Sequence, residues 1–267
     1  MIAEAMIDAV YIAVPHYLHQ PVATEAFAHG LHVITEKPAA LSLADAQEMY
    51  EAADRAGKQL YEAQVLQFTR EVETLHEVVR DGRYGKPLDA CFERLSARPG
   101  WVQGSWLFEK EKSGLLPFDL HIHDLDMMVS VFGEPQSVDY TSCAGPDAPC
   151  REQYRFRYAF AGGITASAEA AWFNACLPFT ARWWRVYFER GLLVCDGGLT
   201  GYGADGTVTS FDVEDPVKVE CGANLPPSGW FLRELSHFVA RAKENRPSER
   251  VPREQVLSVL RTLEKIT

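Results

Sequence analysis

Residues 9–38, AVYIAVPHYLHQPVATEAFAHGLHVITEKP, decide the fold. The segment opens on a continuous apolar run at residues 9–14, which is typical of a strand buried on both faces of a parallel sheet. Helical spacing follows over residues 21–29, with a proline near the first turn and a glycine just after the last. A second β-rich run occupies residues 31–35. A strand, a helix and a strand in this order predict a right-handed βαβ unit.

The same alternation continues to about residue 67. Residues 42–56 are amphipathic, with a serine as N-cap and a glycine after the end, and residues 59–64 read as a third strand. The sequence therefore predicts an α/β unit over residues 1–67, built on a parallel sheet.

The rest of the chain has a different pattern. After a helical stretch at residues 70–79, short β-rich runs are separated by Gly, Pro, Asp or Asn clusters, which is typical of a mostly antiparallel sheet. The predicted strands span residues 88–98, 137–142, 153–160, 164–173, 182–189, 192–195, 208–213 and 217–221. The glycine-rich residues 197–203 are interpreted as a turn. Further helices are predicted within residues 113–132 and over residues 230–242 and 253–266. We expect an α+β unit at 68–267, an open sheet with helices on one face.

Composition argues against several classes of function. The 267 residues include 26 basic and 37 acidic side chains, a formal net charge of −11, which disfavours binding to nucleic acid or to a membrane. The apolar runs are far shorter than the roughly 20 residues of a membrane-spanning helix. The N-terminus lacks the basic start of a secretory signal, and the six cysteines form no CxxC pair. We therefore expect a cytoplasmic protein with reduced thiols that binds a small molecule.

Glu36, Lys37 and Pro38 directly follow the predicted strand at residues 31–35. Ligands of open α/β sheets bind at the carboxyl ends of the strands, so Lys37 would point into that crevice. The alternative is a solvated loop lysine. A cis or otherwise rigid bond before Pro38 would fix the backbone as a catalytic site requires.

The segment DLHIHDLD, residues 119–126, holds several titratable side chains of complementary type. Asp119 and His123 are four residues apart and would share a helical face. A carboxylate beside an imidazole is what a general base needs. A structural role remains open, as does a metal site with His121, although alternate positions on a helix do not bring both rings to one face.

The segment VPHYLH, residues 14–19, stands at the carboxyl end of the first predicted strand. A loop that leads into a helix N-terminus is a natural place for cofactor contacts. A capping or core role for His19 is the alternative.

Together these segments resemble the Gfo/Idh/MocA family of NAD(P)-dependent oxidoreductases, which includes glucose–fructose oxidoreductase and inositol dehydrogenases. The resemblance extends from Ile7 to Ile266. Its marks are VYIAVPHYLH (10–19), GLHVITEKPAALS (30–42), RDGRYGKP (80–87) and SGLLPFDLHIHDLDMMVSVFGEP (113–135). The specific combination is EKP after a strand, followed later by DxxxHxxD.

The resemblance implies a partial Rossmann sheet at 1–67, the C-terminal half of a dinucleotide-binding domain, and a substrate and oligomerisation domain at 68–267. It implies hydride transfer between NAD or NADP and a sugar, polyol or related hydroxyl or carbonyl substrate. The implied catalytic residues are Lys37, Asp119 and His123. His123 would take the proton from the substrate hydroxyl, Lys37 would hydrogen-bond the same oxygen, and Asp119 would hold and tune the pair.

Further residues carry roles implied by the resemblance. Those implied in cofactor binding are Val14, Pro15, His16, His19, Glu36 and Lys37. Those implied in substrate binding are Asp126, His121 and Trp106, and no metal is implied. Gln67 and Leu107 stand where many members have arginine, which suits a less anionic or smaller substrate.

The family's GxGxxG pattern is not found before Ile12. About two βαβ units are expected to be missing, so the chain reads as truncated at its N-terminus and slightly at its C-terminus. One hypothesis is a truncated dehydrogenase. The other is a catalytically inactive or non-enzymatic ligand-sensing or interaction protein on the same scaffold, since the pyrophosphate-binding helix N-terminus would be lacking.

Bulky aromatic residues at 169–173 and 182–188 predict an apolar outer face on the second sheet. We expect a homo-oligomer formed through this sheet face. The alternative is that these rings fill the core of a single chain.

Overall fold

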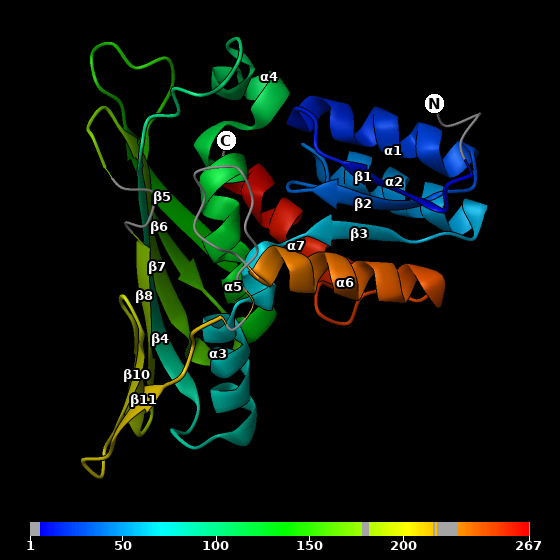
Figure 1. Ribbon diagram of the computed structural model, residues 1–267. Helices are drawn as coiled ribbons and strands as arrows, with labels where there is room; N and C mark the ends of the chain where they lie inside the picture. The colour runs from blue at the N-terminus through cyan, green and yellow to red at the C-terminus, as the bar shows by residue number, and fades with distance from the viewer. Residues whose placement is uncertain (1–5, 178–181, 216, 218–228, 267) are drawn as a thin grey trace.

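The computed structural model describes residues 6–177, 182–215, 217 and 229–266, which form two sheets with helices between and around them (Figure 1). The first sheet is parallel, with the order β1-β2-β3. Its strands are β1 (Ala9–Ile12), β2 (His32–Glu36) and β3 (Leu60–Ala63). The predicted βαβ alternation is confirmed, with each strand end within two residues of the expected position.

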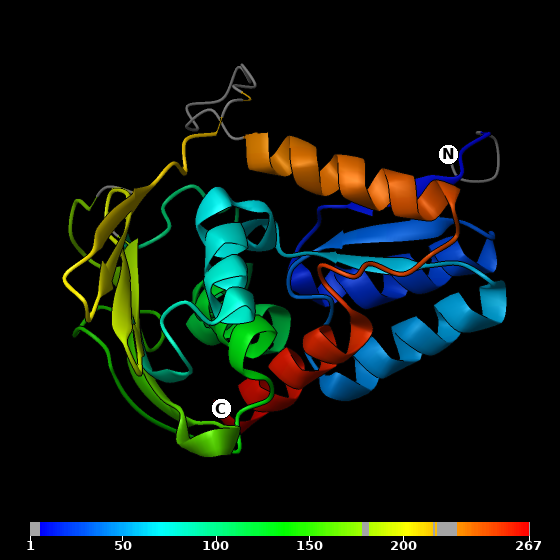
Figure 2. The same ribbon diagram turned by 90° about the horizontal axis from the view of Figure 1, so that it is seen from below.

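Helices cover both faces of the parallel sheet. α1 (His19–Ala28) and α2 (Leu43–Ala56) lie on one face, and α6 (Gly229–Lys243) lies on the other (Figure 2). Tyr61 of β3 stacks on Phe238 of α6 with ring centroids 5.2 Å apart. The sequence did not place α6 here, because the helix is far from this sheet along the chain.

Local signals set the helix ends. The Ser42 side chain accepts a hydrogen bond from the Asp45 N–H at 3.0 Å, and Gly57 ends α2 in a left-handed conformation, both as expected. Thr69 caps the start of α3 (Arg70–Asp81) in the same way. These caps satisfy backbone groups that a helix end leaves without partners.

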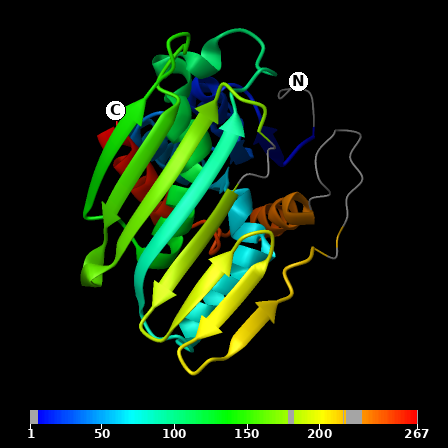
Figure 3. The same ribbon diagram turned by 90° about the vertical axis from the view of Figure 1, so that its left-hand side faces the viewer.

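The second sheet has eight strands in the order β11-β10-β9-β8-β4-β7-β6-β5. Only the β4–β7 pairing is parallel, so the prediction of a mostly antiparallel sheet is confirmed. The strands are β4 (Pro87–Ala97), β5 (Ser137–Cys143), β6 (Gln153–Ala159), β7 (Thr165–Phe173), β8 (Arg182–Phe188), β9 (Gly191–Cys195), β10 (Leu199–Gly203) and β11 (Val208–Phe211). No helix lies over its outer face (Figure 3).

The inner face of this sheet packs on helices. α3 and α5 (Ile122–Phe132) lie against it, and α7 (Arg253–Leu263) packs on α5 and α2. The shorter helices are η1 (His16–Leu18), η2 (Val65–Phe68), η3 (Trp106–Phe108), α4 (Lys110–Ser113), the π-helix η4 (Pro117–His121), η5 (Ala161–Gly163) and η6 (Glu264–Ile266). None of the helices described is long and apolar enough to cross a bilayer.

The interpretation of residues 197–203 as a turn is wrong, because most of that segment is strand β10. A Cβ atom on Gly201 would lie 2.2 Å from the Tyr84 hydroxyl oxygen, and one on Gly191 would lie 2.5 Å from the Tyr84 ring. These glycines make room for a tyrosine. The strand predicted at 217–221 lies outside the described residues, except for its first position.

The large rings of the second sheet point mostly inward. Trp172, Trp184 and Phe188 are buried, whereas Trp183 is only partly buried and Tyr187 is exposed. This division follows from the alternation of side chains along a strand. Three of the six aromatic rings that motivated an apolar outer face therefore fill the core of the single chain.

Candidate active site

Two loops meet at the carboxyl edge of the parallel sheet, one after β1 and one after β2. The buried His19 joins them, with Nδ1 2.7 Å from the Pro38 carbonyl oxygen and Nε2 2.9 Å from the Val14 carbonyl oxygen. Burial lowers the pKa of His19, and the two carbonyl contacts act in the opposite direction. Since a neutral imidazole has one N–H, it donates to one of these carbonyls at a time. His19 is thus a structural tie between the two loops.

Lys37 lies at this edge and points toward Asp119. Its Nζ donates to Asp119 Oδ1 at 2.9 Å and to the Asp119 carbonyl oxygen at 2.6 Å. The Lys37–Pro38 peptide bond is cis, and the following Ala39 N–H donates to Glu62 Oε1 at 2.6 Å. Asp119 and Glu62 therefore hold this turn from two sides.

Asp119 combines burial with two cationic or potentially cationic neighbours. Burial by itself raises its pKa, but Lys37 and His16 outweigh that effect and the net pKa is lowered. His16 Nε2 lies 3.6 Å from Asp119 Oδ1, and His16 Nδ1 donates to the Ser113 carbonyl oxygen at 2.9 Å. Burial, then Lys37, lowers the His16 pKa to about 4. A carboxylate, an ammonium and a neutral imidazole thus share one small volume.

His123 lies in the first turn of α5, close enough to Lys37 to feel its charge. Its pKa lies well below the usual value because of burial first and then the positive charges of Lys37, Arg94 and Arg182. Its Nδ1 is enclosed without a hydrogen-bond partner in the described part of the chain. Asp119 pairs with Lys37 and His16 rather than with His123. Residues 117–121 form a π-helix rather than the α-helix that the expected i,i+4 pairing assumes.

Two of the residues expected to bind substrate are enclosed. Asp126 is buried and accepts hydrogen bonds from Gln67 Nε2 and Gln255 Nε2, both at 2.6 Å. Burial raises its pKa to about 6. His121 is also buried, stacked on Phe156 with centroids 3.9 Å apart. In this conformation neither side chain faces open space.

The remaining predicted residues lie around the cluster of Lys37, Asp119 and His16, which we call the Lys37 corner. Trp106 lies edge-on to His16 with centroids 5.0 Å apart. Glu36 accepts a hydrogen bond from the Tyr11 hydroxyl. On the first loop, Val14 is exposed and the following Pro15 is partly buried. The structure therefore brings the two loops, Lys37, Asp119 and Trp106 to one edge.

Sequence reasoning missed two buried acids near Glu36 at this edge of the sheet. Burial raises the pKa of Glu62 to about 8 and that of Glu234 to about 9, with neighbouring carboxylates adding to each. Both Glu234 oxygens lack a hydrogen-bond partner within the described residues. Glu62, one residue before the end of β3, could have been found from its place at the same sheet edge as Glu36. Nothing local marks Glu234, which reaches the site only through the packing of α6.

The titratable groups do not converge as metal ligands do. Over the described ranges, no cluster of three or more His, Cys, Asp or Glu side chains could hold a metal ion. His121 and His123 point to different surroundings.

Sequence models of one family match most of the chain. The model described as an oxidoreductase family with an NAD-binding Rossmann fold matches residues 1–64, and the GFO/IDH/MocA C-terminal domain matches residues 72–194. The chain belongs to the GFO/IDH/MocA family. The resemblance deduced from the EKP and DxxxHxxD segments is thereby confirmed.

Curated relatives within the GFO/IDH/MocA family match about half of the chain. A 2,7-anhydro-N-acetylneuraminate hydratase of Mediterraneibacter gnavus is 36% identical over 140 residues, 51% of this chain and 36% of the relative. A 1,5-anhydro-D-fructose reductase of Ensifer adhaerens is 31% identical over 134 residues, 50% of this chain and 40% of the relative. The match thus spans well under half the length of these relatives.

Solved structures share the fold over nearly the whole chain. An oxidoreductase from Agrobacterium radiobacter, in complex with NAD+, L-tartaric acid and magnesium, has a TM-score of 0.86 at 19% identity and covers 99% of this chain and 78% of its own. A levoglucosan dehydrogenase in complex with NADH and levoglucosan has a TM-score of 0.81 at 20% identity. The match covers 100% of this chain and 80% of the dehydrogenase chain. At this identity the likeness shows the GFO/IDH/MocA fold.

One end of a family dinucleotide fits the residues present. The partly exposed Glu36 carboxylate can accept hydrogen bonds from ribose hydroxyls, and the exposed Val14 offers an apolar surface on the loop that His19 ties to Pro38. The pyrophosphate end has no matching element in the described part of the chain. Residues 201–206 spell GxGxxG, but they lie in the β10–β11 hairpin and open no helix.

Proposed function

We propose that the protein is an NAD(P)-dependent oxidoreductase. It transfers a hydride between a nicotinamide cofactor, NAD or NADP, and a sugar, polyol or related hydroxyl or carbonyl substrate. The observation that carries this proposal is the ion pair of Lys37 and Asp119 beside neutral histidines at the carboxyl edge of the parallel sheet. An ammonium donor near a neutral imidazole is the set that alcohol oxidation needs.

Each protein group has a defined task in the proposed reaction. Oxidation of a carbinol carbon breaks its C–H and O–H bonds, and the nicotinamide, when bound, supplies the hydride acceptor. Lys37 donates a hydrogen bond to the substrate oxygen and stabilises the negative charge that develops there. His123, kept neutral by burial and by nearby cations, takes the proton at Nε2, because Nδ1 is enclosed. Asp119 holds the Lys37 ammonium in place.

The names of the relatives support a sugar-like substrate. Anhydro sugars recur among them, in the 1,5-anhydro-D-fructose reductase and in the 2,7-anhydro-N-acetylneuraminate hydratase. The Agrobacterium and levoglucosan dehydrogenase structures were solved with NAD+ or NADH. Glu36, Val14, Pro15, His16 and His19 line or fix the loops on which the proposed cofactor would rest.

The test is reduction of NAD+ and NADP+ by the protein with a panel of sugars, polyols and sugar acids. We expect turnover with at least one member, and a loss of about 10²-fold or more in kcat/KM for Lys37→Ala. Lys86→Ala, at an exposed lysine, is the matched control and should keep full activity. The proposal fails if no member is oxidised, or if Lys37→Ala behaves like Lys86→Ala.

A non-enzymatic ligand-sensing or interaction protein on the same scaffold is the second candidate. It is favoured by the one observation that no glycine-rich turn follows β1 to receive a pyrophosphate. Fluorescence titration of NAD(H) and NADP(H) separates the two, since tight binding of either nucleotide contradicts this candidate.

We also propose that the protein is a homo-oligomer formed through the outer face of the eight-stranded sheet. Tyr187 remains exposed on this face, Trp183 on the same strand is only partly buried, and no helix covers the face (Figure 3). Light scattering on the purified protein and on Tyr187→Lys tests the proposal. We expect more than one copy in the wild type and dissociation in the variant; a wild-type monomer would contradict it.

A further inference from the structure

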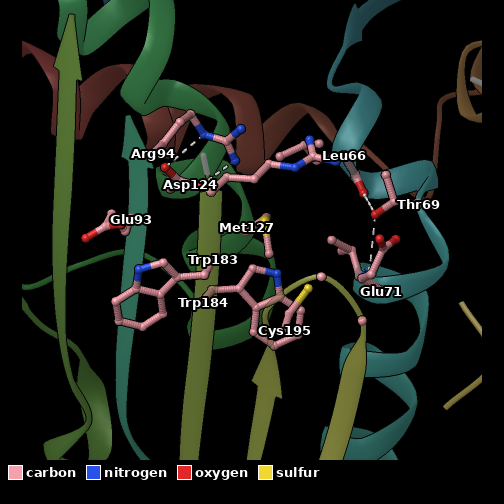
Figure 4. A pocket seen from close by; sticks show the side chains of 14 residues that line it. Leu66, Thr69, Glu71, Glu93, Arg94, Asp124, Met127, Trp183, Trp184 and Cys195 are labelled. Carbon is pink, nitrogen blue, oxygen red and sulfur yellow. Dashed lines mark hydrogen bonds and ion pairs between the residues drawn. The ribbon is translucent and has the colours of Figure 1, made fainter. Parts of the chain in front are cut away.

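A cavity of about 290 Å³ lies between the inner face of the second sheet and the helices α3 and α5 (Figure 4). Its lining includes Glu71, Arg94, Asp124, Arg182, Trp184 and Cys195. Asp124 directly follows His123 in the chain. After burial and Lys37, the charges of Arg94 and Arg182 also lower the pKa of His123. The cavity therefore adjoins the proposed reaction centre.

Two arginines face each other across neighbouring strands of this cavity. Arg94 of β4 and Arg182 of β8 are directly paired in the antiparallel register. Like charges in such positions destabilise a sheet unless anions compensate them. One of the two is compensated, since Arg94 Nε and Nη2 donate to the two Asp124 oxygens at 3.0 and 2.6 Å. The side chains of Arg94 and Asp124 are only 11% and 3% exposed.

Arg182 has no such partner. Within the described ranges no carboxylate lies within 4.0 Å of its guanidinium, whose one ring contact is with Trp230 at 5.1 Å. Glu71 of α3 lines the same cavity but forms no ion pair with Arg182. Burial, followed by the charge of Arg94, lowers the pKa of Arg182. The lining thus holds three carboxylates, those of Glu71, Glu93 and Asp124, and two guanidiniums, and Arg182 is the guanidinium without a carboxylate at contact distance among the described residues.

We infer that Arg182 is the carboxylate-binding residue of a substrate pocket, and that the substrate is a sugar acid or a related hydroxy acid. The planar guanidinium matches a carboxylate with two parallel hydrogen bonds. Because the Glu71 carboxylate also lines the cavity, a monoanion meets less charge repulsion there than a phosphate dianion. The inference rests on the proposed function, because the hydroxyl-bearing carbons would then extend toward His123 and Lys37.

The pocket also revises the expectation of a less anionic substrate. That expectation came from Gln67 and Leu107, which stand where many family members have arginine. Gln67 is buried against Asp126, and Leu107 is fully buried. Neither side chain lines the cavity, so their lack of charge says nothing about the group that Arg182 would bind.

Isothermal titration of the protein with gluconate and glucuronate, against the neutral glucitol and glucose, tests the inference. We expect the acids to bind at least about 10-fold more tightly than their neutral counterparts, and Arg182→Gln to remove about 10-fold or more of acid affinity. Arg182→Lys keeps the positive charge but loses the planar pair of N–H donors, so this variant should retain part of the acid affinity. Glucose 6-phosphate is included as the dianionic competitor.

Arg185→Gln is the matched control. Arg185 lies on the same strand but is exposed on the opposite face, so its loss should leave acid binding unchanged. Equal melting temperatures of the two Gln variants would show that both fold. The inference is overturned if neither acid binds, if the neutral compounds or glucose 6-phosphate bind better, or if Arg182→Gln binds the acids like wild type.

The outcome is separable from that of the proposed function. Acid binding that depends on Arg182 without any nicotinamide reduction would reject the oxidoreductase and keep the anion pocket. Reduction with neutral sugars alone, unaffected by Arg182→Gln, would keep the oxidoreductase and reject the pocket.

Discussion

Asp119 and Asp126 lie seven residues apart in one motif, yet their surroundings are opposite. Asp119 contacts the Lys37 ammonium, and its pKa stays below the usual value in spite of burial. Asp126 contacts two amides and no cation, and burial raises its pKa to about 6. The residue type is shared and burial acts to raise both pKa values, so the Lys37 ammonium beside Asp119 makes the main difference. One carboxylate can support a charged reaction centre, and the other ties α5 to Gln67 and Gln255.

Removing the charge at Asp119 should have the largest effect. Asp119→Asn leaves the Lys37 ammonium without its anion, so we expect kcat/KM to fall about 10²-fold and the free energy of unfolding at pH 7 to drop by about 3 kcal/mol. The lowered pKa means that the stabilisation is present above the usual carboxyl pKa and is lost as the pH falls through the native pKa. Urea unfolding at pH 7 and at pH 3 checks this sign.

The same change at Asp126 is the matched control for Asp119→Asn. Asp126→Asn keeps the shape of the side chain and one oxygen that accepts from the Gln amides. The free energy of unfolding should therefore fall by at most about 1 kcal/mol, and kcat/KM should stay nearly unchanged. Equal losses of activity in the two variants would remove the distinction between the two carboxylates.

Glu234 is, like Asp126, a buried acid whose pKa is raised. Its pKa of about 9 means that the folded protein holds a proton that the unfolded chain releases at a much lower pH. Stability should therefore fall as the pH rises from the usual carboxyl value toward pH 9. Glu234→Gln should flatten this slope and stabilise the protein at pH 7 by up to about 3 kcal/mol. Thermal unfolding across pH 5–9 measures both, and an unchanged slope would show that Glu234 is ionised.

The cations around His123 predict the pH dependence of the proposed reaction. The neutral imidazole is the active form, so kcat/KM should be flat near pH 7 and decline only well below pH 6.5. Arg182→Gln removes one of the three cations that lower this pKa, so the acid limb should move to higher pH by a fraction of a unit. The control Arg185→Gln should leave the limb in place, and a limb near pH 7 in the wild type would contradict the assignment.

Much of the fold could be predicted from the sequence because its signals are local. Apolar runs, the Ser42 cap and the end of α2 at Gly57 placed the first three strands and α2 closely. β10 was missed because its glycines serve the packing of the distant Tyr84. The division of the chain at residue 67 stays a prediction, and α6 shows that a late segment completes the early sheet.

The candidate site was predictable in part. The meeting of Lys37 with Asp119 follows from the sheet edge and the family motif, and the structure brings them together. The enclosure of Asp126 depends on Gln67 and Gln255, which are distant along the chain. The spacing also did not indicate that Asp119 lies in a π-helix. The unpaired state of Arg182 depends on strand register, which a single sequence does not reveal.

The central claim is that the Lys37 corner carries out hydride transfer. The most direct measurement incubates the protein and NAD+ or NADP+ with carbon-deuterated glucose, glucitol or gluconate, and analyses the nicotinamide by mass spectrometry. In the wild type we expect reduced nicotinamide that carries one deuterium, and in Lys37→Ala we expect this product to form at no more than about a hundredth of the wild-type rate. Absence of deuterium from the nicotinamide with every substrate, or equal transfer in the two proteins, would contradict it.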